Sequence, residues 1–347
     1  MKDFAGKIAF ITGGASGAGL GYAQIFSEAG MKVVIADYRQ DHLDEAMAYF
    51  KEKGAPVHAI QLDVTDRDGY SKAADETEKV FGDVPNLLIL NAGVNVFGPA
   101  EASTYADYDW VVGVCFGGVV NGLVTFVPRM IKAGGDRHIA ATVSWGAFGS
   151  GTTTAPYSAA KAGVLNLMES YWQALTPYGI GVTAICPANI RSRIYEAALL
   201  NRPEQYADTG YNVSEDTQKL LAGIHAHGMD PRVLAEWLKK GIENEQFLVA
   251  PYEHGPRMIE IAVERFKYYA SPEGMKAWEE KQKAPLSEED IMLNSEREGY
   301  DMRASLEARK QDPAKGSSIG RDRVDVGFGK ARADLDWVDE RKRYEKK

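Results

Sequence analysis

The sequence predicts an α/β fold, in which a doubly wound parallel sheet carries helices on both faces. Short apolar runs bounded by turn residues recur along residues 1–255, and amphipathic stretches of helical length lie between them. This alternation produces βαβ units and therefore a mostly parallel sheet. No internal repeat or Pro/Gly-rich linker divides this part of the chain. The expected strands are residues 7–12, 32–37, 57–63, 87–91, 138–144, 181–187 and 246–250.

The 347 residues fit one large domain with an appendage. We expect a single domain over residues 1–255. The segment 190–240 is long for a connection between two strands, so we expect its helices to fold over the site as a substrate lid. Residues 256–347 contain repeated clusters of Lys, Arg, Asp and Glu, which predict a charged extension that is helical or partly disordered.

Composition narrows the possible partners and compartment. The formal net charge of -9 argues against nucleic acid or an anionic membrane as the main partner. The two cysteines, Cys115 and Cys186, both lie in apolar segments, so we expect no disulfide and a reducing cytoplasm. The start of the chain runs directly into a strand, which leaves no room for a signal peptide.

Two further features invite an alternative interpretation. Residues 110–127 are almost wholly uncharged, as in a transmembrane helix, but the run is barely long enough. A helix buried at a subunit interface is the better account. His225 and His227 form the only close histidine pair in the sequence and lack Cys or carboxylate partners at ligand spacing. We therefore expect surface or core histidines here and no metal site.

A glycine-rich turn follows the first expected strand and suits a dinucleotide phosphate. The chain must turn sharply there and let backbone amides approach a pyrophosphate at a helix N-terminus, and only glycine permits both. Asp37 ends the second strand, where a carboxylate accepts hydrogen bonds from both ribose hydroxyls and repels a 2′-phosphate. This favours NAD, while Arg39 keeps NADP as the alternative. The loop residues predicted to bind the cofactor are Gly13, Ser16, Gly17, Ala18 and Gly19.

Ser144, Tyr157 and Lys161 form the predicted catalytic group. Tyr157 and Lys161 are four residues apart, so on a helix they share one face and the ammonium acts on the phenol. A phenol titrates near ~10 in water, and each unit of depression corresponds to about 1.4 kcal/mol of preference for the phenolate. A nearby positive charge therefore makes Tyr157 a better base.

The glycine turn, Ser144 and the Tyr-x-x-x-Lys motif together resemble the short-chain dehydrogenase/reductase family over residues 5–255. The resemblance implies a Rossmann-type sheet and a nicotinamide cofactor. Tyr157 would remove the alcohol proton during hydride transfer, Ser144 would bind the substrate oxygen, and Lys161 would hold the nicotinamide ribose. Further cofactor contacts implied by matching motifs, besides Tyr157 and Lys161 themselves, are Asp63, Val64, Asn91, Ala92, Gly93, Pro187, Ile190 and Ser192.

One position departs from the family pattern. The family places an asparagine in the helix before the fifth strand, where it holds a water of the proton relay, and Cys115 occupies that position here. A thiol is a weak donor and acceptor. Asn121 is six residues further on, so a helix rotates it away from the same face. Either the enzyme works with a modified relay or the chain has drifted toward binding or sensing. The intact Ser, Tyr and Lys favour the modified relay.

Residues after these motifs and in the expected lid are predicted to line the substrate pocket. Several are aromatic, which suits a bulky aromatic secondary alcohol or ketone. A structural alternative is that some of them pack in the core or in a subunit interface. The predicted substrate residues are Asn95, Phe97, Trp145, Phe148, Asn189, Tyr195 and Tyr206.

A closer resemblance sharpens the expected reaction. Residues 93–99, 109–114, 121–130 and 186–190 are similar to the Cα-dehydrogenases of lignin β-aryl ether catabolism. This implies NAD-dependent oxidation of a benzylic secondary alcohol to an aryl ketone, in a homodimer or homotetramer. An NADPH-dependent ketone reductase or another alcohol dehydrogenase of the same family is the first alternative. A non-catalytic dinucleotide sensor or scaffold is the second.

Overall fold

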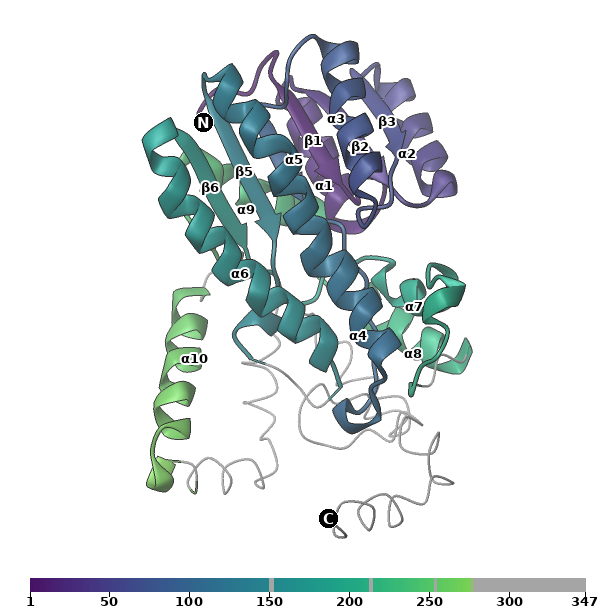
Figure 1. The fold of residues 1–347 in the computed structure, drawn as a ribbon, viewed down its shortest axis with the longest axis vertical. Helices are drawn as coiled ribbons and strands as arrows, with labels where there is room; N and C mark the ends of the chain where they lie inside the picture. Colours follow the sequence, from purple (N-terminus) through teal and green to yellow (C-terminus); the bar gives the residue numbers. More distant parts are fainter. Residues whose placement is uncertain (150–152, 212–214, 253–254, 275, 277–347) are drawn as a thin grey trace.

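The structure is a computed structural model that describes residues 1–149, 153–211, 215–252, 255–274 and 276. Its centre is a parallel sheet in the order β3-β2-β1-β4-β5-β6-β7 (Figure 1). The order reverses between β1 and β4, which confirms the doubly wound fold and creates a switch point where such sheets bind ligands. The strands are β1 (Ile8–Thr12), β2 (Lys32–Asp37), β3 (Val57–Gln61), β4 (Leu87–Leu90), β5 (Arg137–Thr142), β6 (Ile180–Ile185) and β7 (Leu248–Val249).

Several strands stop earlier at their carboxyl ends than the sequence patterns predict. The patterns place Asn91 and Ser144 inside strands, but the parallel pairing ends before each of them. The Asn91 N–H donates instead to Thr12 Oγ1 at 2.9 Å. Ser144 caps a short 3₁₀ turn, η3 (Trp145–Ala147). These polar residues therefore lie beyond the paired strands, at the edge of the sheet where the candidate site lies.

Helices cover both faces of the sheet and complete two apolar cores. One core contains residues of α3 (Arg67–Phe81), α5 (Gly118–Ala133) and α6 (Ala155–Leu175). The other contains residues of α1 (Gly17–Glu28), α2 (Gln40–Lys53) and α9 (Pro231–Glu243). Adjacent residues of β1 point to opposite sides, so Phe10 lies in the first core and Ile11 in the second, both fully buried.

One helical run connects the core to the site. It comprises α4 (Tyr105–Val112), a π-helical turn η2 (Gly113–Gly117) and α5. By length and composition the run Tyr105–Ala133 is able to cross a membrane. Here Leu123, Phe126 and Met130 are fully buried against the sheet, as in the core helix of a globular domain. The predicted role at a subunit interface stays a prediction.

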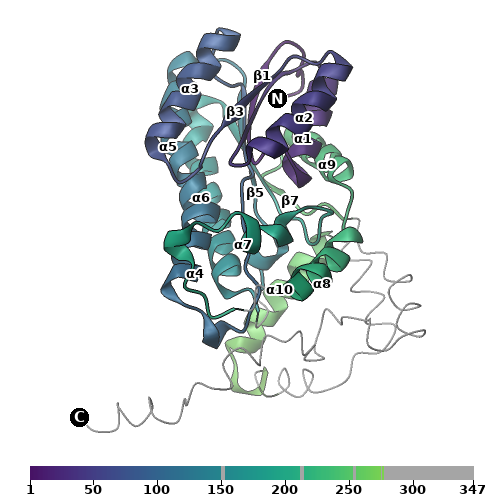
Figure 2. The same cartoon turned by 90° about the vertical axis from the view of Figure 1, so that its right-hand side faces the viewer.

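Shorter elements gather at the end of the sheet toward which the strands point (Figure 2). Between β6 and α9 lie η5 (Ile194–Glu196), α7 (Ala197–Leu200), η6 (Glu204–Tyr206) and α8 (Glu215–Ala226). They occupy the segment that the sequence predicts as a lid. Two further turns are η1 (Ala100–Ala102) and η4 (Thr176–Tyr178).

The predicted C-terminal extension begins with a helix, α10 (Gly255–Tyr269). Arg265 of this helix donates to the backbone carbonyl of Phe148, in the loop that follows Ser144. The first part of the extension therefore contacts the catalytic side of the domain. The charged stretch 277–347 lies outside the described residues.

Candidate active site

The glycine turn after β1 has a shape that side chains would prevent. Gly13 and Gly17 have φ values of 61° and 50°, in the left-handed region that favours glycine. A Cβ on Gly19 would lie 1.9 Å from the Gly13 carbonyl oxygen, so α1 packs directly against the turn. The N-terminus of α1 is thereby held at the carboxyl edge of the sheet, where backbone N–H groups suit an anion.

Asn91 fixes this turn from the neighbouring strand. Its Nδ2 donates to the carbonyl oxygens of Thr12 and Gly13 at 3.0 and 3.2 Å, and its Oδ1 accepts from Thr142 Oγ1 at 3.0 Å. The Thr12 hydroxyl accepts in turn from the N–H groups of Asn91 and Ala92. The network links β1, β4 and β5, so Asn91 shapes the cradle in addition to its predicted cofactor contact.

Asp37 lies at the end of β2 with its carboxylate turned toward the glycine turn. Oδ2 accepts from Ala15 N at 3.2 Å and Oδ1 from Arg39 N at 3.1 Å. Burial raises the pKa of Asp37, and these backbone hydrogen bonds oppose the shift. The Arg39 guanidinium is engaged by Asp41, with Nε 2.9 Å from Oδ1, and by Asn201. The cation that keeps NADP as an alternative is therefore already paired with a carboxylate.

Asp63 and Val64 lie just after β3, which ends at Gln61, and Asp63 does not cap the next helix. Its Oδ1 accepts from the N–H and the hydroxyl of Thr65, both at 2.8 Å. The cap of α3 is Asp66. Asn121 Nδ2 donates to the carbonyl oxygen of Val64 at 2.9 Å. Asn121 is thus bound to this loop and does not take the place of the family asparagine, whose position Cys115 occupies.

The predicted catalytic residues come from two adjacent elements, the end of β5 and the first turns of α6. Lys161 is buried, and its Nζ donates to Thr142 O at 2.7 Å and lies 5.6 Å from the centre of the Tyr157 ring. Ser144 Oγ accepts from Gly146 N at 3.0 Å. A Cβ on Gly146 would lie 3.4 Å from Ser144 Oγ and 3.8 Å from Tyr157 Cε1, so this glycine is close to both side chains.

Burial dominates the electrostatics of this group. It raises the pKa of the Tyr157 phenol, and a hydrogen bond with Ser144 acts in the opposite direction. Burial lowers the pKa of Lys161. The phenol is therefore protonated at neutral pH unless positive charge stabilises the phenolate. Lys161 supplies one such charge on the same helix face.

Cys115 lies in the π-helical turn η2 and is fully buried. Its Sγ donates to Val94 O at 3.1 Å and accepts from Val94 N at 3.4 Å. A Cβ on Gly93 would lie 3.6 Å from this sulfur and 3.7 Å from Lys161 Nζ. Burial raises the pKa of the thiol, and Lys161 opposes this. The cysteine thus binds the loop that follows the Asn-Ala-Gly motif, and its burial favours the neutral thiol over a thiolate.

The segment after β6 is bound both to the turn that follows β5 and to the residues just before α9. Pro187 O accepts from Trp145 N at 2.7 Å, and Ile190 forms a parallel bridge with Met229 just before α9. Ser192 packs so closely on the glycine turn that a Cβ on Gly17 would lie 2.8 Å from its own Cβ. Ser192 therefore lies beside the glycine turn, and Pro187 and Ile190 precede it in the same segment.

The predicted substrate residues fall into separate groups. Phe97 and Tyr195 both contact the His225 ring, with centroid distances of 6.4 and 5.9 Å. Trp145 and Phe148 pack against each other at 5.1 Å. Tyr206 and Tyr157 pack on one buried cluster around Cys115 and Trp110. Asn95 and Asn189 are buried. The side-chain oxygen of Asn95 is enclosed and has no hydrogen-bond partner among the described residues.

Comparison with known proteins identifies the family. The family described as short chain dehydrogenase matches residues 7–202. The chain belongs to this family. It is 51% identical over 252 residues to the C alpha-dehydrogenase of Sphingobium sp. (strain NBRC 103272 / SYK-6). The match covers 73% of this chain and 82% of that protein. The family prediction and the predicted oxidoreductase class are confirmed, and the chain is an NAD(P)-binding enzyme for a small-molecule substrate.

Solved structures agree with this assignment. The apo form of LigD from Sphingobium sp. strain SYK-6 is 42% identical, with a TM-score of 0.65, and the match covers 78% of this chain and 100% of that one. A short chain dehydrogenase from Burkholderia phymatum in complex with NAD is 27% identical, with a TM-score of 0.73, and covers 83% and 100%.

Sequence reasoning assigned no role to one residue that contacts two predicted substrate residues. His225, expected as a surface or core histidine, contacts the rings of Phe97 and Tyr195. Its Nδ1 is 3.3 Å from the Ile190 carbonyl oxygen, so this nitrogen donates. Burial lowers the pKa of His225, which favours the neutral ring. No sequence signal pointed to it, because its partners lie far away along the chain.

Proposed function

We propose that this enzyme oxidises the benzylic secondary alcohol of a bulky aromatic substrate to the ketone, with NAD as the hydride acceptor. The observation that carries the proposal is the arrangement of Ser144, Tyr157 and Lys161 beside a buried apolar cluster that contains the rings of Trp110 and Tyr211 and on which Tyr206 also packs. The 51% identity to a C alpha-dehydrogenase supports the same reaction. An aromatic pocket wall suits an aryl carbinol.

In the proposed mechanism the chain's residues manage the proton and the substrate oxygen. Ser144 donates a hydrogen bond to the alcohol oxygen and orients it toward Tyr157. The Tyr157 phenolate accepts the hydroxyl proton as the carbinol C–H bond breaks and the C=O bond forms. The cofactor supplies the hydride acceptor. Lys161, whose Nζ is anchored by Thr142 O, stabilises the phenolate and would hold the ribose of the bound cofactor.

The preference for NAD over NADP is also part of the proposal. A 2′-phosphate would be placed beside the buried Asp37 carboxylate, which repels it. Arg39 is held by Asp41. The proposed cofactor contacts are those that the sequence motifs predict: Gly13, Ser16, Gly17, Ala18, Gly19, Asp37, Asp63, Val64, Asn91, Ala92, Gly93, Tyr157, Lys161, Pro187, Ile190 and Ser192.

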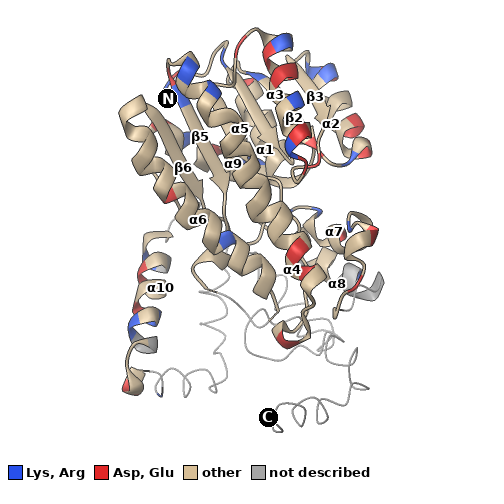
Figure 3. Cartoon of the chain, in the orientation of Figure 1, with Lys and Arg blue, Asp and Glu red and all other residues tan. Residues whose placement is uncertain are grey.

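We further place the enzyme in the cytoplasm as a homodimer or homotetramer. Figure 3 shows that the outward surfaces of α5 and α6 carry few charged residues. Val124 of α5 and Trp172 of α6 are 63% and 42% exposed. Such a surface suits contact with a second copy. Sedimentation equilibrium measures the number of subunits, and a monomer at micromolar concentration would contradict this part of the proposal.

Reduced-nicotinamide formation by the purified enzyme tests the proposed activity. NAD and NADP are offered in parallel with two-ring β-aryl ether benzylic alcohols and with one-ring aryl carbinols, beside a Tyr157→Phe variant. We expect turnover with NAD that falls by about a thousandfold or more in the variant, because the proton acceptor is lost. NADPH-dependent ketone reduction would instead support a reductase. Cofactor binding without any turnover would support the sensor alternative.

A further inference from the structure

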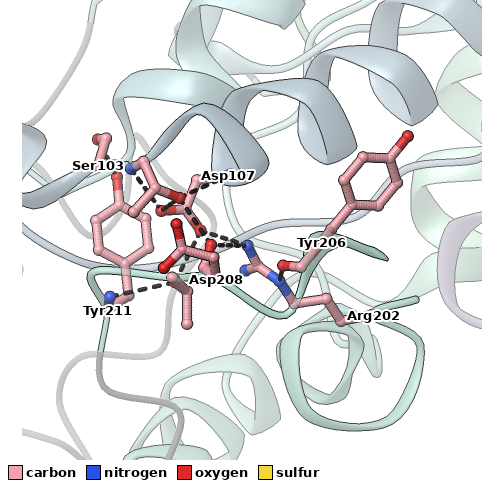
Figure 4. Close-up of polar contacts among 8 residues, drawn as sticks. Ser103, Asp107, Arg202, Tyr206, Asp208 and Tyr211 are labelled. Atoms are coloured by element: carbon pink, nitrogen blue, oxygen red, sulfur yellow. Dashed lines mark hydrogen bonds and ion pairs between the residues drawn. The ribbon is translucent and has the colours of Figure 1, made fainter. Parts of the chain in front are cut away.

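A buried ion pair fastens the loop 201–211, here called the lid loop, to the start of α4. Arg202 Nη2 lies 2.7 Å from Asp107 Oδ1, and the two side chains are only 6% and 0% exposed (Figure 4). In every other ion pair reported between described residues, at least one partner is 31% exposed or more. The lid loop is therefore attached in a way that no other described segment is.

Asp107 also organises its own helix and the far end of the lid loop. Its Oδ2 accepts from Thr104 N at 2.9 Å, which completes the capping box of α4. Its Oδ1 accepts from Thr209 Oγ1 at 2.8 Å as well as from Arg202. Thr104 Oγ1 donates to Asp208 O at 2.8 Å. One carboxylate thus ties both ends of the lid loop to the same helix N-terminus.

Arg202 connects this attachment to the catalytic side. Its Nε donates to the carbonyl oxygen of Tyr206, so the loop curls around the guanidinium. The guanidinium lies 5.2 Å from the centre of the Trp110 ring. Trp110 belongs to the buried cluster on which both Tyr206 and the catalytic Tyr157 pack. Figure 4 shows the Tyr206 ring directed away from the ion pair. The pair therefore fixes the backbone from which Tyr206 projects.

A buried ion pair is a poor way to gain stability alone. The desolvation of two charges offsets most of their attraction, and apolar residues of similar volume often hold a structure equally well. Its directional hydrogen bonds do, however, specify one docking geometry. The removal of one partner leaves a buried charge, so the loop must detach or rearrange. A buried ion pair of this kind suits a pocket wall whose position must be fixed.

We propose that Asp107 and Arg202 are positioning residues that set the wall of the substrate pocket by docking the lid loop, and with it Tyr206, beside Tyr157. The inference rests on the proposed function, because it assigns the recognition of the bulky aryl substituent to this wall. A substrate with two rings needs the docked wall. A one-ring carbinol reaches Ser144 and Tyr157 without it.

The test compares Asp107→Asn, Arg202→Met, Arg202→Lys and the double variant Asp107→Asn/Arg202→Met with the wild type. Arg232→Gln is the matched control, because it breaks the exposed pair with Glu28. The measurements are KM and kcat for a two-ring benzylic alcohol and a one-ring aryl carbinol, the Kd of NAD, and the rate of chymotryptic cleavage after Tyr206 without substrate.

We expect each single variant that removes one charge to raise KM for the two-ring alcohol by about tenfold or more. For the one-ring carbinol, kcat and KM should stay within about twofold of the wild-type values. The Kd of NAD stays unchanged and cleavage after Tyr206 accelerates. Arg202→Lys recovers part of the loss, because it keeps the charge but not the forked geometry. The double variant is no worse than the poorer single variant, because the pair acts as a unit.

Equal losses for both alcohols together with weaker NAD binding would reduce the pair to a general structural role and overturn the proposal. Unchanged KM for the two-ring alcohol would overturn it as well. If the wild type oxidises neither alcohol, the proposed function fails. The cleavage and NAD measurements then decide separately whether the pair docks the lid loop, and an unchanged cleavage rate refutes that docking.

Discussion

The glycine turn and the segment predicted as the lid contribute to the candidate site in opposite ways. The turn depends on backbone atoms and on side chains that are missing, since a single methyl group on Gly19 would collide with Gly13 O at 1.9 Å. The lid depends on large side chains contributed by separate segments, such as Arg202 on Trp110 and His225 on Tyr195. We therefore expect a substitution in the turn to abolish cofactor binding. Substitutions in the lid should instead lower activity by degrees and alter substrate selectivity.

The largest effect is expected in the glycine turn. Gly19→Ala forces the Gly13 carbonyl away from α1 and distorts the cradle. We expect NAD affinity and turnover to fall by about a hundredfold or more, since a displacement of only about 1 Å at a binding site is enough for such a loss. Titration calorimetry measures the affinity. Gly223→Ala is the control, because nothing lies within 4 Å of the added methyl group. NAD binding within threefold of the wild type would refute the account.

The second effect concerns the charge beside Tyr157. Lys161→Met removes the buried ammonium, so the pKa of the phenol, already raised by burial, rises further. Since oxidation uses the phenolate, the rising limb of kcat/KM against pH moves to higher pH. We expect a loss of about a hundredfold or more at neutral pH.

The pH profile separates this effect from a loss of structure. Lys161→Arg keeps a positive charge and should retain more activity at neutral pH than Lys161→Met. A uniform drop of Lys161→Met at every pH, with no displacement of the limb, would show that Lys161 acts only by holding the cofactor.

The third effect is intermediate in size and concerns Cys115, which belongs neither to the glycine turn nor to the lid. Cys115→Ala leaves the buried N–H and carbonyl of Val94 without their side-chain partner, which should cost about 1–3 kcal/mol in the free energy of unfolding. Cys115→Asn preserves folding, because an amide both donates and accepts. It should raise turnover or shift the pH profile if the proton relay limits the rate. Urea denaturation and initial rates measure both variants, and unchanged rates would show that another group holds the relay.

The smallest effect is expected in the aromatic part of the lid. His225→Phe keeps a ring beside Phe97 and Tyr195 but loses the hydrogen bond to Ile190 O. One such bond contributes about 1 kcal/mol to the stability of this packing, so KM for the bulky alcohol should rise by no more than roughly fivefold. His227→Gln is the control, because His227 is exposed. A hundredfold loss of kcat in His225→Phe would instead make His225 part of the chemistry.

Local patterns in the sequence predicted the sheet and most of the cradle. Each apolar run became a strand because parallel strands are buried on both faces, and the glycine turn followed the first of them. The sequence left the strand ends uncertain, because polar residues such as Asn91 use their hydrogen bonds across strands. These contacts depend on the folded sheet.

The lid was much less predictable from its residues. Asp107 and Arg202 are 95 positions apart, so no local pattern marks them as a pair. His225 gains its role from rings on two other segments. The contact between Cys115 and Val94 depends on a π-helical turn, which a pattern of apolar residues does not distinguish from ordinary helix. Long-range side-chain contacts of this kind need the fold itself.

The bridge between Ile190 and Met229 joins the cofactor side to the lid side. The Arg191 N–H donates to Met229 O and the Met229 N–H to Asn189 O, both at 3.0 Å. A ligand that orders one strand of this bridge lowers the entropy that ordering the other still requires. Cofactor and substrate affinities are then reciprocally coupled, because each must raise the other by the same factor. Cooperative binding of the nicotinamide and the substrate is then expected from two short segments that share two backbone hydrogen bonds.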